Sequence, residues 1–241
     1  MPDVDRLHAS EPRQRWRIVF RRDEDARFLA HLDAMKLWER ALSRAGIPVA
    51  RTEGMSPRPR IVFAAPLPLG MLAEREIVDV VLSERLTAAD LRGRLACDLP
   101  RGFGLVDLYD VWLHAPSVAS QLVGATYRLD LAGAPGAPVC RADVRAGVTV
   151  LLAAERLDRE RLKEKRVVAY DLRPLLDGIE IVRWDDSDGG AGTLRCMVRH
   201  SQDEGTGRPD EVVAALSEAI GVPLETVTAT RERLVLADGA D

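Results

Sequence analysis

The chain has 241 residues, which is enough for one large domain or two small ones, each with a core of its own. Apolar residues make up 46% and charged residues 30%, the balance of a soluble globular protein, and no apolar run approaches the ~18 residues that cross a membrane. The three cysteines, Cys97, Cys140 and Cys196, are odd in number and far apart, which favours reduced thiols in a cytoplasmic protein over a disulfide framework.

The net charge of −4 conceals an uneven distribution. Residues 12–60 hold 12 Lys and Arg against 6 Asp and Glu, whereas the rest of the chain holds 22 against 32. Local potential, more than total charge, attracts phosphate groups. The basic front portion is therefore a candidate anion-binding region, and an ordinary solvated charged surface is the alternative.

The first half of the chain predicts the order β-α-β-β-α-β. Residues 1–14 are polar and predict a disordered leader without the apolar core of a signal peptide. Apolar residues recur every three or four positions from His31 to Ala45, which predicts a helix that Gly46 and Pro48 end. The other expected elements are strands at 16–22, 47–50, 60–64, 76–82 and 103–113 and a helix at 87–97. This order predicts a ferredoxin-like unit over residues 15–115.

The second half, residues 124–238, repeats this rhythm with weaker signals. Pro209 fits the first turn of a final helix, and the Gly-Gly turn at 185–192 predicts a hairpin. Residues 141–152 fit a helix or a strand, and the charged run 158–166 favours a solvated helix face. Strands are expected at 125–131, 167–172, 179–184, 193–199 and 225–236. We therefore expect an α+β protein of two ferredoxin-like units in tandem, with mostly antiparallel sheets and helices on one face.

Several short motifs together carry a family resemblance. They are FLAHLD (residues 28–33), ERAL (39–42), RAGIPV (44–49), GMSPRP (54–59) and PLPLG (66–70), with KRVVAYDLRP (165–174) and VTATR (227–231) as later landmarks. With these motifs the chain resembles the radical SAM-linked protein family. Members of that family consist of an uncharacterised domain, alone or on the C-terminal side of a radical SAM protein with a cobalamin-binding-like region. The resemblance implies a radical SAM protein as partner and no established activity.

The residues also exclude several kinds of chemistry. A radical SAM cluster needs three closely spaced cysteines, and the three cysteines here lie more than forty residues apart. The sequence contains neither a P-loop nor a dinucleotide-binding glycine motif, and its four histidines have no zinc-ligand spacing. We therefore predict no cofactor, no metal site and no membrane partner, and the oligomeric state stays open.

Two groups of residues are candidates for a site. His31 and Asp33 lie in the first turn of the predicted helix and are weak candidates for acid–base catalysis, although His31 is favoured as a structural anchor. The candidate anion-binding residues are arginines of the helix end and the proline-rich loop, extended by two basic residues of the second half: Arg44, Arg51, Arg58, Arg60, Lys165 and Arg166.

The four tryptophans are a further candidate feature. Trp16, Trp38, Trp112 and Trp184 could stack on bases, but the aromatic content is only 5% and Trp38 lies on the apolar stripe of the predicted helix. Core packing is therefore the favoured interpretation of the tryptophans.

Three functions are compatible with these observations. The first is a non-catalytic accessory module that holds RNA or another phosphorylated substrate for a radical SAM partner through the arginine-rich loop. The second is an RNA-processing enzyme that uses His31 as acid or base. The third is a protein-interaction scaffold, in which residues 57–70 dock onto the partner enzyme.

Overall fold

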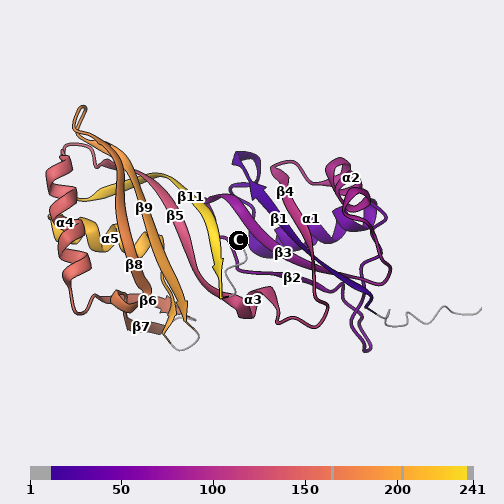
Figure 1. The fold of residues 1–241 in the computed structure, drawn as a ribbon. Coiled ribbons are helices and arrows are strands. Elements are labelled where there is room, and N and C mark those ends of the chain that lie inside the picture. Colours follow the sequence, from indigo (N-terminus) through magenta and orange to yellow (C-terminus); the bar gives the residue numbers. More distant parts are fainter. Residues whose placement is uncertain (1–11, 164–165, 202–203, 238–241) are drawn as a thin grey trace, which may run out of the picture. The chain divides into compact units, whose positions relative to one another are not determined.

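The computed structural model describes residues 12–163, 166–201 and 204–237 (Figure 1). The chain divides into two compact units, Met1–Leu122 and Val123–Asp241. Most of the predicted leader, residues 1–11, lies outside the described residues, and Gln14 already belongs to the first strand. Among the described helices none is long and apolar enough to span a bilayer.

The first unit combines one antiparallel sheet with two long helices. Its strands stand in the order β2-β3-β1-β4, and each neighbouring pair is antiparallel. Its elements are β1 (Gln14–Arg22), a 3-10 turn (Glu24–Ala26), α1 (His31–Arg44), β2 (Ile61–Phe63), β3 (Leu72–Leu82), α2 (Ala88–Asp98), β4 (Phe103–Val111) and the short α3 (Val118–Gln121).

The helices of the first unit cover one face of its sheet. Trp16, Ile18 and Phe20 alternate along β1 and point to this face, where they join a core with Trp38 and Leu42 of α1. The rings of Phe20 and Trp38 lie 4.8 Å apart between centroids. Because side chains alternate along a strand, the residues between them point to the opposite face, which neither long helix covers.

The second unit has a sheet in which β9 lies between β5 and β8, both antiparallel to it, with β11 beside β5. A separate two-stranded sheet pairs β6 with β7. The elements are β5 (Leu122–Gly133), α4 (Arg141–Ala153), β6 (Asp158–Lys163), β7 (Arg166–Asp171), a 3-10 turn (Arg173–Leu175), β8 (Leu176–Asp185), β9 (Ala191–Ser201), β10 (Gly205–Thr206), α5 (Pro209–Ile220) and β11 (Leu224–Leu236).

Helices α4 and α5 approach each other closely at Gly147. A Cβ atom at this position would lie 2.5 Å from Cγ2 of Ile220 and 2.8 Å from Cδ1 of Leu216. Glycine is therefore required here for the two helix backbones to come together. Gly221 then ends α5 with a left-handed φ of 70°.

The prediction of a mixed α+β protein with mostly antiparallel strands is confirmed. Residues 141–152, where helix and strand were both open, form α4. Two predictions of local structure were wrong. Residues 47–50 form only an isolated bridge between Val49 and Leu82. Residues 158–163 of the charged run form strand β6 and not a helix, because they pair with β7 along their whole length. Arg159 on this strand also pairs with Glu211 and Glu218 of α5, at 2.9 and 2.7 Å.

Candidate functional site

At one end of the first unit's sheet, basic residues lie on the face that the two long helices leave uncovered, where the short α3 packs. Val111 of β4, Arg15 of β1 and Val81 of β3 stand opposite one another in register. The amide of Val81 donates to the carbonyl of Arg60 at 3.0 Å, so Arg60 continues this row beyond β3. Because Ile61 packs on the helix side, alternation places the side chain of Arg60 on the other face.

Arg60 belongs to a hairpin formed by residues 50–60. Arg51 and Pro59 form an antiparallel bridge, and the amide of Arg60 donates to the carbonyl of Ala50 at 2.8 Å. Thr52 and Arg58 are joined twice: the amide of Thr52 donates to the Arg58 carbonyl at 2.9 Å, and the amide of Arg58 donates to Oγ1 of Thr52 at 3.0 Å. These bonds give the proline-rich loop a defined backbone.

The hairpin separates its three arginines. Arg58 and Arg60 are two residues apart, so they lie on one side of their strand, whereas Arg51 shares the opposite side with Pro59. Arg51 donates from Nη1 to the carbonyl of Pro57 at 3.2 Å. Arg58 and Arg60 are exposed, and within the part of the chain that the structure describes their guanidinium groups form no hydrogen bond and no ion pair.

Arg44, the fourth predicted arginine of the first unit, is occupied elsewhere. At the end of α1 it donates from Nη2 to the carbonyl of Asp98 at 2.9 Å and lies 3.5 Å from the Asp98 carboxylate. An exposed pair of this kind contributes little energy. Of the four arginines predicted to bind anions in the first unit, Arg58 and Arg60 are therefore the two that lie next to each other and can contact a ligand.

The remaining predicted site residues lie apart from the hairpin. His31 is half-buried with its ring edge-on to Phe63, 5.6 Å between centroids, and exposed Asp33 lies 3.5 Å from Lys36. In the second unit, Arg166 begins β7 opposite Lys163, and Lys165 lies outside the described residues. Their predicted roles in acid–base chemistry and anion binding stay predictions.

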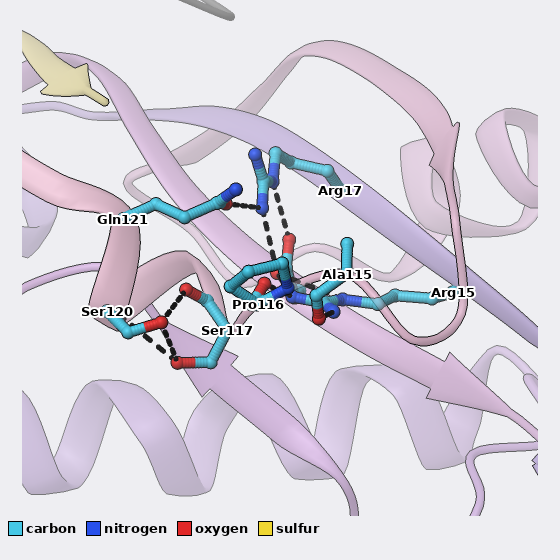
Figure 2. A network of polar contacts seen from close by, with 8 residues as sticks. Arg15, Arg17, Ala115, Pro116, Ser117, Ser120 and Gln121 are labelled. Carbon is cyan, nitrogen blue, oxygen red and sulfur yellow. Dashed lines mark hydrogen bonds and ion pairs between the residues drawn. The ribbon is translucent and has the colours of Figure 1, made fainter. Parts of the chain in front are cut away.

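A buried ionic network lies on the same sheet face, and sequence reasoning missed it (Figure 2). Asp79 of β3 accepts hydrogen bonds from both Arg15 and Arg17, with 2.8 Å between its Oδ1 and Nε of Arg17. Arg17 and Asp79 are each only 1% exposed. Arg17 also donates from Nη2 to Oε1 of Gln121 in α3 at 2.7 Å. The available signal was the alternation of arginine with apolar residues in RWRIVF (15–20), opposite the lone aspartate of EIVDVV (76–81).

The network fixes the segment that leaves β4. Arg15 donates to the carbonyl of Ala115 at 2.6 Å and to that of Pro116 at 2.9 Å. Burial by itself would lower the pKa of Arg17, but the hydrogen bonds and the charge of Asp79 outweigh it and raise that pKa. Arg15 and Arg17 therefore hold the two ends of residues 115–121 against the sheet through hydrogen bonds from charged donors.

Trp112 lies between this clamp and the end of β4, and it is 71% exposed. Its ring meets that of His114 edge-on, with 5.5 Å between centroids and 67° between planes. Trp16 and Trp38 are buried and Trp184 is half-buried, with its Nε1 donating to the carbonyl of Val139 at 3.2 Å. The expectation of core packing is thus confirmed for Trp16 and Trp38 and wrong for Trp112, because Val111 is the last residue of the strand.

The opposite end of the same sheet, where Arg22 pairs with Ala73 and Phe103, carries two exposed apolar side chains. Phe28 is 73% exposed and Leu69 64% exposed. Their two segments meet because the amide of Gly70 donates to the carbonyl of Arg27 at 3.0 Å and Nε of Arg27 donates to that of Gly70 at 2.8 Å. The FLAHLD and PLPLG motifs thereby form one surface.

In the second unit, the sheet face turned away from α4 and α5 is polar but balanced in charge. Glu232 of β11 accepts from Arg195 at 2.7 Å and from Arg128 at 3.2 Å, and Arg195 also reaches Glu180 at 3.0 Å. The hydrogen bond from Arg195 is the main reason that the pKa of Glu232 lies below its ordinary value. Because its arginines are matched by carboxylates, this face offers phosphate groups little attraction.

Fold and site together define an α+β protein whose first unit carries two available guanidinium groups and an exposed indole at one end of its sheet. The model of the family described as "Uncharacterized protein conserved in bacteria (DUF2344)" matches residues 15–209. The chain belongs to this family. A search of the curated proteins found no match.

Two solved structures similar to this chain are complexes that contain Cbf5 and Nop10. One chain of "Crystal Structure of a Cbf5-Nop10-Gar1 Complex" gives a TM-score of 0.52 at 11% identity, covering 97% of this chain and 55% of that chain. A chain of "Crystal structure of the archaeal box H/ACA sRNP Nop10-Cbf5 complex" gives 0.47 at 13% identity, covering 91% and 47%. This chain therefore spans about half the length of these structures. At such identity the likeness concerns the α+β fold alone.

Proposed function

We propose that the chain is a non-catalytic recognition module that binds RNA, through its phosphate groups, at Arg58 and Arg60. One observation carries the proposal. Two exposed guanidinium groups, without a partner among the described residues, stand on one side of a hairpin whose backbone is fixed by its own hydrogen bonds.

The chemistry of the two side chains fits phosphate. A guanidinium group donates paired hydrogen bonds to phosphate oxygens, and charge makes these bonds strong. Residues two apart on a strand are separated by about 7 Å, so Arg58 and Arg60 can contact different phosphates of one strand. Because Pro57, Pro59 and the hairpin bonds restrict the backbone, little conformational entropy is lost when a ligand binds.

Substitution of both arginines tests this proposal. For Arg58→Ala/Arg60→Ala we expect weaker binding of a single-stranded RNA oligonucleotide, and a slope of log K against log salt that is shallower by about 1.4, since each lost phosphate contact removes ~0.7. The matched control is Arg21→Ala/Arg40→Ala, which removes the same charge from exposed positions on β1 and α1. An unchanged slope in the first variant, or an equal change in both, would contradict the proposal.

We also propose the finer architecture, two ferredoxin-like units over residues 15–115 and 124–238. In the first unit the order β1-α1-β2-β3-α2-β4 with sheet order β2-β3-β1-β4 supports it. In the second unit β5, α4, β8, β9, α5 and β11 follow the same order, with sheet order β8-β9-β5-β11. The β6–β7 hairpin is then an insertion after α4.

The exposed apolar surface of Phe28 and Leu69 favours a second function, that of a scaffold which docks onto a partner protein. The resemblance to radical SAM-linked proteins suggests a radical SAM enzyme as that partner. Phe28→Ser/Leu69→Ser should abolish co-purification of a cluster-bearing enzyme and leave RNA affinity unchanged, because this surface lies at the other end of the sheet from Arg60. Retained co-purification would rule out docking through these two side chains.

A further inference from the structure

We propose that Trp112, supported by His114, is a stacking site for an unpaired base, so that the ligand is single-stranded nucleic acid. This inference rests on the proposed function and names the class of its ligand. The indole of Trp112 is 71% exposed, and tryptophan is enriched in binding surfaces, where its ring supplies a large contact area. Every base has a face that stacks on an aromatic ring, whatever the sequence.

The position of Trp112 is fixed before any ligand arrives. Val111, directly before it, is paired with Arg15 in the sheet, and the amide of Ala115 donates back to the carbonyl of Trp112 at 2.9 Å. Arg15 holds the carbonyls of Ala115 and Pro116 and is itself held by buried Asp79 (Figure 2). The turn that carries the indole is thus bound at both its ends, which limits the entropy lost on stacking.

Trp112 and the two free arginines belong to the same end of the sheet. Val111, Arg15, Val81 and Arg60 form one row, and three steps between neighbouring strands place the backbones of Val111 and Arg60 about 14 Å apart. Trp112 follows Val111 beyond the end of β4, so a short single strand that passes along this end of the sheet can place phosphates at Arg58 and Arg60 and one base at Trp112. A duplex keeps its bases stacked inside, so its phosphates could reach the arginines but its bases could not reach the indole.

The test compares wild type, Trp112→Ala, Trp112→Phe and Arg58→Ala/Arg60→Ala against a single-stranded RNA oligonucleotide and its duplex. We expect Trp112→Ala to weaken single-strand binding by about 5- to 150-fold, the range typical for loss of one stacked base, with an unchanged salt slope because the phosphate contacts remain. Trp112→Phe should recover most of the affinity. Duplex binding should be weaker than single-strand binding and insensitive to Trp112.

The outcomes separate the two proposals. If Trp112→Ala binds single strands like wild type while Arg58→Ala/Arg60→Ala does not, the stacking site is overturned and the phosphate contacts stand. The stacking site is also overturned if the duplex binds as tightly as the single strand or more tightly. It is overturned as well if Trp112→Ala weakens binding of a protein partner and leaves RNA binding unchanged. If neither variant differs from wild type, both proposals fail. Unfolding midpoints of all variants should match, since Trp112 and both arginines are exposed.

Discussion

At the scale of single residues, Asp79 is the acceptor that makes two buried guanidinium groups tolerable. Arg15 and Arg17 both donate to it, and the remaining donors reach Gln121 and the carbonyls of Ala115 and Pro116. Replacing a buried ion pair by apolar groups can be neutral, but removing one partner leaves a buried charge without compensation. The network should therefore be most sensitive to loss of its single carboxylate.

Asp79→Asn should lower the free energy of unfolding by about 3–5 kcal/mol, because an amide cannot balance two buried cations. Asp107→Asn is the matched control: Asp107 pairs with Arg92 at 3.3 Å on the surface, and its loss should cost at most about 1 kcal/mol. Urea unfolding of both variants measures the difference. Similar losses in the two variants would show that Asp79 does not compensate the buried arginines.

The cysteines provide a second test at this scale. Burial raises the pKa of the Cys196 thiol to about 12, whereas Cys97 is exposed. Since the thiolate is the reactive form, iodoacetamide at pH 8 should label Cys97 in the native protein and leave Cys196 intact. Both should react in urea. Native labelling of Cys196 as fast as Cys97 would contradict its place in the core.

At the scale of elements, local sequence patterns predicted most of the helices and strands. The elements that these patterns did not predict depend on contacts between segments distant in the sequence. The stop at Gly46, the start of α5 at Pro209 and the Gly-Gly hairpin before β9 are short-range signals, and all three were found. Strand β6 was missed because its charges resemble a helix face, while the acids that pair with Arg159 come from α5.

In the candidate site, too, local sequence patterns predict some residues and miss others. The hairpin of Arg58 and Arg60 could be expected from its two prolines and its arginines. The exposure of Trp112 could not, because it depends on buried Arg15 holding the segment that follows β4. No pattern near Trp112 indicates that partner, which lies about a hundred residues earlier in the chain.

Substituting alanine for either of two helical glycines should change the free energy of unfolding in opposite directions. Gly93→Ala in α2 should raise the free energy of unfolding by about 0.5–1 kcal/mol, because nothing lies within 4 Å of the added Cβ and alanine is the better helix former. Gly147→Ala in α4 should lower it by about 1–3 kcal/mol, because the Cβ would meet Ile220 and Leu216 of α5. Stabilisation by both substitutions would show that α4 and α5 are not in close contact.

At the scale of the whole molecule, the net charge of −4 and the proposed RNA binding are compatible because the charges are unevenly arranged. The arginines on the sheet face of the second unit are matched by Glu180 and Glu232. In the first unit, the two ends of the sheet differ: one has the exposed side chains of Arg58, Arg60 and Trp112, and the other has exposed Phe28 and Leu69. A ligand with phosphates and a partner with an apolar surface could therefore bind without competing.

Ultraviolet cross-linking of the full chain to a single-stranded RNA oligonucleotide, followed by peptide mapping, locates the residues that contact RNA. We predict cross-links in the peptides that contain residues 50–60 and 111–116, which fade as salt is raised from 50 to about 200 mM. Cross-links confined to the second unit or to the surface of Phe28 and Leu69, or none above an acidic control protein, would contradict the claim that this end of the first sheet is where RNA binds.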